Sequence, residues 1–242
     1  MPKSTFYEMI EKGTIKKVTP PGRRDGYYLK AAIDNLAKAR DLFTVQYALD
    51  PPNFEKATEK DIQGIYDLTV SLWGTRIAAP YETRLARYRR NSNIYYVLKY
   101  LDVVVGYSSL IPMATRAIDA IIETGKPGQA TLDEILPFTP GTPIEYAFME
   151  IAVRDEVPKP KQYAMHLISG TSGVIDDFAR KDVLIKNLFA ISSTTDGIGL
   201  CRKLGFKEIA LPPNGEMKVF LLNLATSTHP LAHEYQEIIK QQ

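Results

Sequence analysis

Cysteine and histidine are scarce in this chain of 242 residues, which contains one cysteine and three histidines. A single cysteine excludes an internal disulfide bond and is typical of proteins in a reducing compartment. The histidines, His166, His229 and His233, lack the spacing of zinc ligands, so we expect no metal site. The 30 lysines and arginines nearly balance the 28 acidic residues, which leaves a formal net charge of +2.

Long apolar runs are also absent. No run reaches the ~18 residues that a membrane-spanning helix needs, so we expect no membrane partner. The first residues are polar and hold no apolar signal-peptide core, which favours a cytoplasmic location. Pro51 and Pro52 fix an extended backbone and prevent a helix from continuing beyond Leu49. We therefore expect two domains, residues 1–50 and residues 51–242.

The first 30 residues are basic, with seven lysines and arginines against three acidic residues. Residues 4–10 predict a helix that ends at Gly13. Residues 14–18 and 27–29 predict the two strands of a hairpin, because a turn rich in proline and glycine separates them. Apolar residues at helical spacing then predict a helix over residues 31–49.

This order of elements resembles the winged helix-turn-helix of MerR- and excisionase-type regulators. The resemblance implies duplex DNA as a partner, with the helix in the major groove and the hairpin, or wing, at the phosphates. The alternative is a basic hairpin docked on the main domain. The residues that would face DNA are Lys3, Ser4, Thr5 and Tyr7 on the helix and Lys16, Lys17, Arg23 and Arg24 on the wing.

The main domain alternates helical and strand-like patterns. Apolar periodicity predicts helices over residues 58–73, where Thr58 is the expected cap, and over residues 81–90, whose four arginines we expect on a solvated face. Enrichment in β-branched and aromatic residues predicts strands over 94–100, 103–111 and 144–153.

The stretch from Asn187 to Phe206 joins an apolar strand, a helix and a closing Leu-Gly-Phe. Together with the strand and helix that open the main domain, it resembles the GNAT N-acetyltransferase family over residues 54–224. The resemblance implies an α/β (α+β) fold, a mixed sheet flanked by helices in which one strand splays away from its neighbour to admit acyl-coenzyme A. It also implies acetyl-CoA as co-substrate and an amine, on a small molecule or a protein, as acceptor.

In this family the backbone N–H groups at the start of the helix after the fourth strand bind the pyrophosphate of coenzyme A. The matching segment here runs from Lys161 to His166, and His166 is expected to crowd the phosphate. A glycine pair at Gly170 and Gly173 predicts close packing of this helix, or a shifted binding loop. The implied cofactor-binding residues are Ile151, Val153, Lys161, Gln162, Tyr163, Ala164 and Thr194.

Amide formation needs a base for the amine and an acid for the leaving thiolate. The resemblance implies a glutamate on the fourth strand as base, here Glu150 with Glu145 in reserve, although either could instead pair with an arginine. The family's acid is a tyrosine whose position holds Cys201. A thiol could donate that proton, and a small buried apolar residue is the other interpretation of Cys201.

Residues 113–143 form a connection that the family usually lacks. A helix over 114–123 and a shorter one over 132–136 are predicted within it. Its length favours a substrate-side lid or a homodimer arm, and a surface excursion is the alternative. Three functions stay open: an N-acetyltransferase, an acyl-CoA or metabolite sensor in a DNA-binding regulator, and a structural dimer.

Overall fold

The computed structural model describes residues 3–13, 15–19, 21–22, 26–34, 36–37, 52–75, 77–100, 102–124, 130–210 and 217–241. The chain divides into two compact units. The first unit holds Met1–Asp50 with Glu156–Pro158, and the second holds Pro51–Asp155 with Lys159–Gln242. None of the described helices is long and apolar enough to cross a membrane.

The first unit contains a helix followed by a small hairpin. Helix α1 (Lys3–Glu11) is followed by Gly13, whose φ of 71° is the left-handed conformation that suits glycine at a helix end. Strands β1 (Lys17–Val18) and β2 (Tyr27–Tyr28) pair antiparallel. Both strands are shorter than predicted. The Ile15 N–H donates to the carbonyl of Met9 at the end of the helix, so residue 15 is not part of β1.

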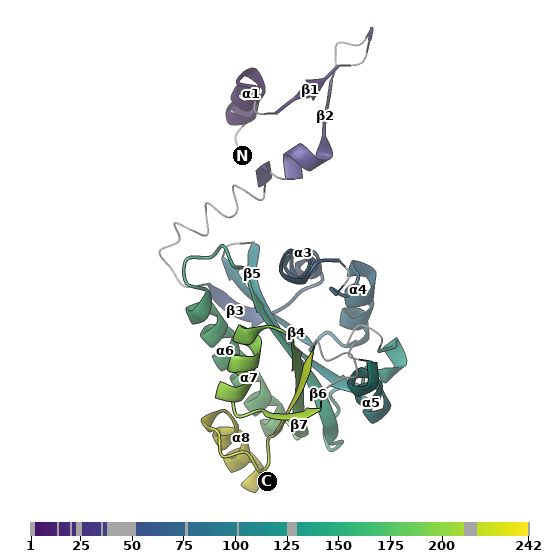
Figure 1. The fold of residues 1–242 in the computed structure, drawn as a ribbon, viewed down its shortest axis with the longest axis vertical. Helices are drawn as coiled ribbons and strands as arrows, with labels where there is room; N and C mark the ends of the chain where they lie inside the picture. The colour runs from purple at the N-terminus through teal and green to yellow at the C-terminus, as the bar shows by residue number, and fades with distance from the viewer. Residues whose placement is uncertain are drawn as a thin grey trace. The chain divides into compact units, whose positions relative to one another are not determined.

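The second unit is built on a seven-stranded sheet with the order β3-β4-β5-β6-β7-β9-β8 (Figure 1). All neighbouring pairs are antiparallel except β6 and β7, which run parallel. The strands are β3 (Asn53–Lys56), β4 (Tyr95–Tyr100), β5 (Val103–Met113), β6 (Ile144–Val153), β7 (Ile185–Ser192), β8 (Lys207–Ala210) and β9 (Lys218–Asn223).

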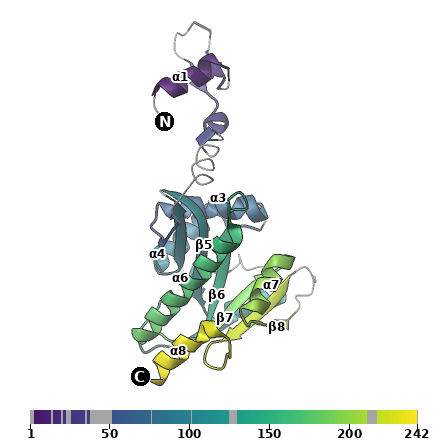
Figure 2. The ribbon, with the colours of Figure 1, turned by 90° about the vertical axis from the view of Figure 1, so that its left-hand side faces the viewer.

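Helices cover both faces of this sheet. One apolar cluster joins the sheet to α3 (Asp61–Trp73), α4 (Tyr81–Arg90) and α5 (Thr115–Thr124). A second cluster joins it to α6 (Pro160–Arg180) and α8 (Pro230–Lys240). Figure 2 shows α6 running across β5, with α8 beside its C-terminal end. A strand covered on both faces has no polar side, which explains why nearly all of β5 is buried.

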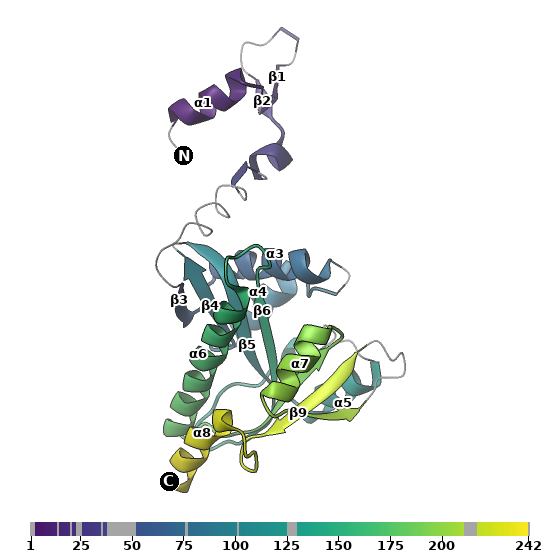
Figure 3. The same ribbon diagram turned by 60° about the vertical axis from the view of Figure 1, so that its left-hand side comes forward.

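The two halves of the sheet separate between β6 and β7. Parallel pairing runs from Ile144, opposite Ile185, to Phe148, opposite Phe189, and stops there. Beyond this point β6 stays paired with β5, and β7 stays paired with β9. Figure 3 shows α7 (Thr195–Lys203) and β9 diverging from α6 and β6. The splayed strand implied by the sequence is therefore present.

Side chains hold the opposite end of the same strand pair together. The Asn187 Nδ2 on β7 donates to the Glu145 carbonyl on β6 at 3.0 Å. The Asn187 Oδ1 accepts from the Asn223 Nδ2 on β9, also at 3.0 Å. Asn187 is buried, so these bonds replace water that it could otherwise bind. The three strands are thus tied at one end and free to diverge at the other.

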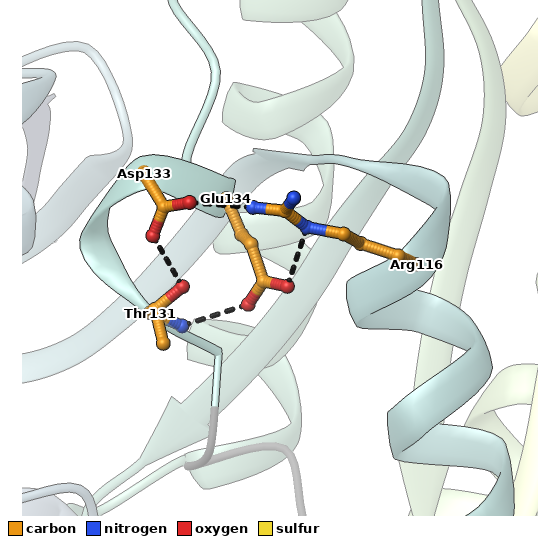
Figure 4. A network of polar contacts seen from close by, with 4 residues as sticks. All are labelled: Arg116, Thr131, Asp133 and Glu134. Carbon is orange, nitrogen blue, oxygen red and sulfur yellow. Dashed lines mark hydrogen bonds and ion pairs between the residues drawn. The ribbon is translucent and has the colours of Figure 1, made fainter.

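The described parts of the connection, residues 113–124 and 130–143, pack on the domain. Its short 3-10 helix η2 (Leu132–Glu134) precedes a single β-bridge between Met113 and Ile135. Figure 4 shows Arg116 of α5 reaching Asp133 and Glu134 of η2, with 2.9 Å between the Arg116 Nε and a Glu134 oxygen. The Asn91 side chain after α4 donates to the Leu136 carbonyl at 3.0 Å.

The predicted elements and the structure differ mainly at helix starts. Helix α4 and strand β6 have the predicted bounds. Helix α3 begins at Asp61 rather than at Thr58, and Thr58 is not its cap. Instead the Thr58 N–H and hydroxyl both donate to the Asp61 carboxylate, each at 2.7 Å, so an acid inside the helix fixes the turn before it.

Candidate active site

The diverging end of β6 carries three of the residues implied by the sequence. Glu150, Ile151 and Val153 all lie beyond Phe148, the last β6 residue that pairs with β7. Successive strand residues face opposite sides of the sheet. Ile151 packs on the cluster of α6 and α8, whereas Phe148, two residues before Glu150, belongs to the cluster of α3, α4 and α5. Glu150 therefore faces the α4 side, and Ile151 faces the α6 side.

Helix α6 begins beside an open hollow of about 430 Å³, lined by Lys159, Pro160, Lys161 and Gln162. Pro160 is the first helical residue and has no N–H to offer. The N–H groups of Gln162 and Tyr163 already donate to the Lys159 carbonyl, at 3.0 and 3.1 Å. An anion here would therefore depend on the helix dipole and two exposed lysines more than on free amides.

The remaining motif residues lie further along α6. His166 is the seventh residue of the helix and is exposed, about 9 Å along the axis from Pro160 at 1.5 Å per residue. His166 therefore lies beyond the first turn of the helix, where the sequence predicts the phosphate. Gly170 lies against the ring of Phe54, so one of the two glycines serves the packing of α6 on β3. Ala164, in the second turn, is half-buried.

Glu150 lies among polar side chains between the sheet and α4. Its Oε2 accepts from the Ser109 hydroxyl at 3.2 Å, across the β5–β6 ladder in which the two residues are direct partners. The Arg84 Nη1 of α4 lies 3.7 Å from the same oxygen. The Glu150 side chain keeps 17% of its surface exposed, whereas the Arg84 side chain keeps only 2%. Solvent therefore reaches this ion pair from the Glu150 side.

Of the four arginines of α4, Arg89 and Arg90 are exposed as expected, whereas Arg84 and Arg87 are buried. The Arg84 guanidinium carbon lies 5.6 Å from the centre of the Tyr107 ring. Burial alone would lower the pKa of Arg84, but Tyr107 and Glu150 together raise it, so Arg84 stays charged. The sequence signal was its position in the stripe of Tyr81, Leu85 and Tyr88, at helical spacing.

Two buried tyrosines complete this pocket. Burial raises the pKa of Tyr107, and the nearby charge of Glu150 raises it further. Burial also raises the pKa of Tyr95. Among the described residues, both hydroxyls and the Arg84 Nε are buried without a hydrogen-bond partner. Both phenols therefore stay neutral beside the ion pair of Arg84 and Glu150.

Glu145, the reserve base, lies elsewhere. It is on β6 at the tied end, where its carboxylate pairs with Lys186 at 2.8 Å. Five residues of strand separate it from Glu150, about 17 Å, and the odd separation turns it to the opposite face. The structure does not bring the two glutamates together.

Helix α7 follows β7 and carries the other predicted residues. Thr194 caps it, because the Thr194 Oγ1 accepts from the Gly197 N–H at 3.1 Å. Cys201 is half-buried against the cluster of α6 and α8. Burial raises the pKa of its thiol to about 11, so the proton stays on sulfur at neutral pH. Cys201 thus approaches from the α6 side, whereas Glu150 faces the α4 side.

The predicted DNA-facing residues belong to the first unit. Lys16 and Lys17 are exposed at β1, and Tyr7 on α1 is 60% exposed. Arg23 and Arg24 lie outside the described residues, as do the side chains of Lys3, Ser4 and Thr5. A helix and a hairpin whose two strands have two residues each do not by themselves identify a winged helix. Among the described residues, no group of three or more acidic, histidine or cysteine side chains could hold a metal ion.

Neither a protein-family model nor a curated protein matches this sequence. Solved structures do match its fold. "GphF GNAT-like decarboxylase in complex with isobutyryl-CoA" is 14% identical, with a TM-score of 0.51 over 71% of this chain and 98% of that chain. The putative acetyltransferase yncA from Salmonella typhimurium, with its cofactor acetyl-CoA, is 16% identical, covers 75% and 98%, and has a TM-score of 0.47.

An aminoglycoside 6'-acetyltransferase type Ii matches less well, at 12% identity and a TM-score of 0.46 over 71% of this chain and 96% of that chain. At these identities a likeness is evidence of fold and not of chemistry. The likeness to GphF agrees with the strand order and with the separation of β6 from β7. The chain therefore has the GNAT fold, and the predicted fold class, a mixed sheet flanked by helices, is confirmed.

Proposed function

We propose that the second unit is an acyl-CoA-dependent N-acetyltransferase that passes an acetyl group directly from acetyl-CoA to an amine. The observation that carries this proposal is the separation of β6 and β7 beyond Phe148, with α6 beginning on the chain that leaves β6. Such a gap exposes strand edges whose backbone groups can bind the amide-containing arm of coenzyme A. The helix start and Lys161 would then hold its pyrophosphate.

The proposed chemistry uses the residues on either side of the gap. The amine nitrogen attacks the thioester carbonyl, a C–N bond forms, and the C–S bond breaks. Glu150 accepts the proton that the nitrogen loses, directly or through water. Cys201 gives its proton to the departing thiolate of coenzyme A, which its raised pKa allows because the thiol is protonated at neutral pH. Ile151, Val153 and Thr194 would line the cofactor.

Acetyl-CoA binding and turnover test this proposal separately. We expect calorimetry to detect acetyl-CoA binding, and Lys161→Ala to weaken it. Lys186→Ala is the matched control, because Lys186 is also exposed but lies at the tied end beside Glu145. Turnover is measured as free coenzyme A thiol released with a panel of primary amines. No binding at millimolar acetyl-CoA would refute both an enzyme and an acyl-CoA sensor.

Binding without turnover would favour the second candidate, a sensor without catalysis. The specific observation for it is that Pro160 and the bonded N–H groups of Gln162 and Tyr163 leave few free amides at the helix start. Decarboxylation, the reaction in the printed name of GphF, is disfavoured here, because the carboxylate of Glu150 would repel an acyl carboxylate. Release of CO₂ from malonyl-CoA would show that decarboxylation does occur and would contradict this expectation.

For the first unit we propose duplex DNA binding through the exposed hairpin cations, which is the DNA-binding part of the sensor candidate. Affinity should fall steeply with salt, because cation–phosphate contacts release counterions. Lys16→Ala with Lys17→Ala should weaken binding and flatten the salt dependence. Lys186→Ala with Lys240→Ala is the control of equal charge in the second unit. Absence of duplex binding at low salt would refute this role.

A further inference from the structure

Arg84 and Glu150 form an ion pair between a helix and the sheet of the second unit. Arg84 comes from α4, and Glu150 comes from β6. A charge as buried as Arg84 is expensive unless an opposite charge lies beside it. Glu150 is the only carboxylate that pairs with Arg84 in the described part of the chain, at 3.7 Å.

Arg84 itself is not available to a substrate, because only 2% of its side chain is exposed. Its guanidinium is held in place by the Tyr107 ring at 5.6 Å. Glu150 is the member of the pair with exposed surface, and the Ser109 hydroxyl fixes the same oxygen, Oε2, that faces Arg84. One carboxylate oxygen is therefore occupied inside the sheet, which leaves the other to act outward.

From this geometry we infer that Arg84 is a positioning residue, which holds the Glu150 carboxylate through Oε2 and so orients its second oxygen toward the acceptor amine. The inference rests on the proposed transferase function, in which Glu150 is the base. A base must lie within hydrogen-bond reach of the proton that it accepts, so a carboxylate held in one orientation favours the transfer. The other ionisable groups around this pocket are Tyr95 and Tyr107, which stay neutral, and Arg87.

The pairing is tested first without any substrate, by a double-mutant cycle on thermal unfolding. Arg84→Met leaves Glu150 as an unpaired, mostly buried charge, and we expect a melting temperature lower by about 10 °C. Glu150→Gln in that background should recover part of the loss. The control cycle uses Arg89, on the same helix as Arg84, and Glu59 before α3, an exposed pair at 2.6 Å whose coupling should be near zero. Additive effects at Arg84 and Glu150 would overturn the inference.

The catalytic role is then tested by measuring kcat and KM separately, using whichever amine supports turnover. Arg84→Met should lower kcat by about 10²-fold with little change in KM, because the base is no longer held in its productive orientation. Arg84→Lys keeps the positive charge and should restore kcat in part. If Arg84→Met folds poorly, Ser109→Ala provides a second measurement, with a smaller loss of kcat.

The outcomes separate this inference from the proposed function. Turnover with an unchanged kcat in Arg84→Met would overturn the positioning role and leave the transferase standing. Acetyl-CoA binding without turnover of any amine would refute both proposals, even if the cycle shows coupling, because the pair would then serve stability alone.

Discussion

Gly170 of α6 lies directly against the ring of Phe54 on β3. A Cβ at position 170 would come within 2.6 Å of the ring, closer than real Cβ atoms approach other atoms. The absence of a side chain therefore lets the helix and the edge strand come together. A Cβ at position 173, one turn later, would have no neighbouring atom within 4 Å. Two glycines that look alike in the sequence thus have different roles.

Alanine at these two positions should have opposite effects on stability. Gly170→Ala forces Phe54 or the helix to move, and we expect a loss of about 1–3 kcal/mol of unfolding free energy. Gly173→Ala meets open space in the middle of a helix, and we expect a gain of about 0.5–1 kcal/mol. Urea denaturation of both variants measures the difference. A destabilised Gly173→Ala would contradict the open space around that position.

The fold could be predicted from the sequence because its signals are local. Enrichment in β-branched and aromatic residues marks β6, and apolar periodicity marks α4, so the pattern alone predicted both bounds. The order of such elements is what carried the resemblance to the GNAT fold. Helix starts were less predictable, since α3 begins at Asp61, whose side chain folds back to accept hydrogen bonds from Thr58.

The candidate site was predictable only in part, because its decisive contacts are between distant segments. Glu150 could be chosen from its place on the strand, but its partner Arg84 is 66 residues earlier, at a position where charge predicts solvent exposure. Glu145 illustrates the same limit of the sequence. It shares a strand with Glu150, yet only the pairing of β6 with β7 places it at the tied end.

Asp176 of α6 should make the stability of the second unit depend on pH. It is 5% exposed, and its Oδ1 has no hydrogen-bond partner among the described residues. Burial raises the pKa of this carboxyl, and the charge of Glu234 on α8 raises it further. A carboxyl with a raised pKa in the folded state favours folding while protonated, and this contribution is lost as pH rises through that pKa.

Asp176→Asn should therefore raise the melting temperature at neutral pH, and the gain should disappear toward pH 4, where the unfolded-state carboxyl also becomes protonated. Asp177→Asn is the control, because Asp177 is exposed and pairs with Arg180 at 2.9 Å. It should produce little or no gain. Calorimetric scans between pH 4 and pH 8 give the comparison, and equal gains for both variants would contradict it.

The thiol of Cys201 should react slowly with thiol-specific reagents. Its pKa of about 11 leaves roughly 300-fold less thiolate at neutral pH than a free cysteine with a pKa of about 8.5. Because the thiolate is the nucleophile, reaction with Ellman's reagent should be at least about 10²-fold slower than that of glutathione. Acetyl-CoA should slow it further if Cys201 faces the cofactor. A rapid reaction, unchanged by acetyl-CoA, would argue against Cys201 as the acid.

The start of α6 allows the sharpest test of cofactor binding, because Pro160 lacks an N–H donor and its neighbour Lys161 supplies a positive charge. Pro160→Ala adds one N–H at the first helical position, and a hydrogen bond to a phosphate oxygen should tighten acetyl-CoA binding about tenfold. Lys161→Ala should weaken binding by a smaller factor, since an exposed cation is screened by salt.

His166→Ala is the third variant in this set, and we expect it to leave the affinity unchanged. The side chain is exposed and lies about two turns beyond Pro160, too far along the helix to meet a phosphate at its start. Calorimetry with acetyl-CoA at two salt concentrations compares all three. If His166→Ala tightens binding while Pro160→Ala does not, the pyrophosphate lies along the side of α6 and not at its first turn. The proposed role of Lys161 and the helix start would then be wrong.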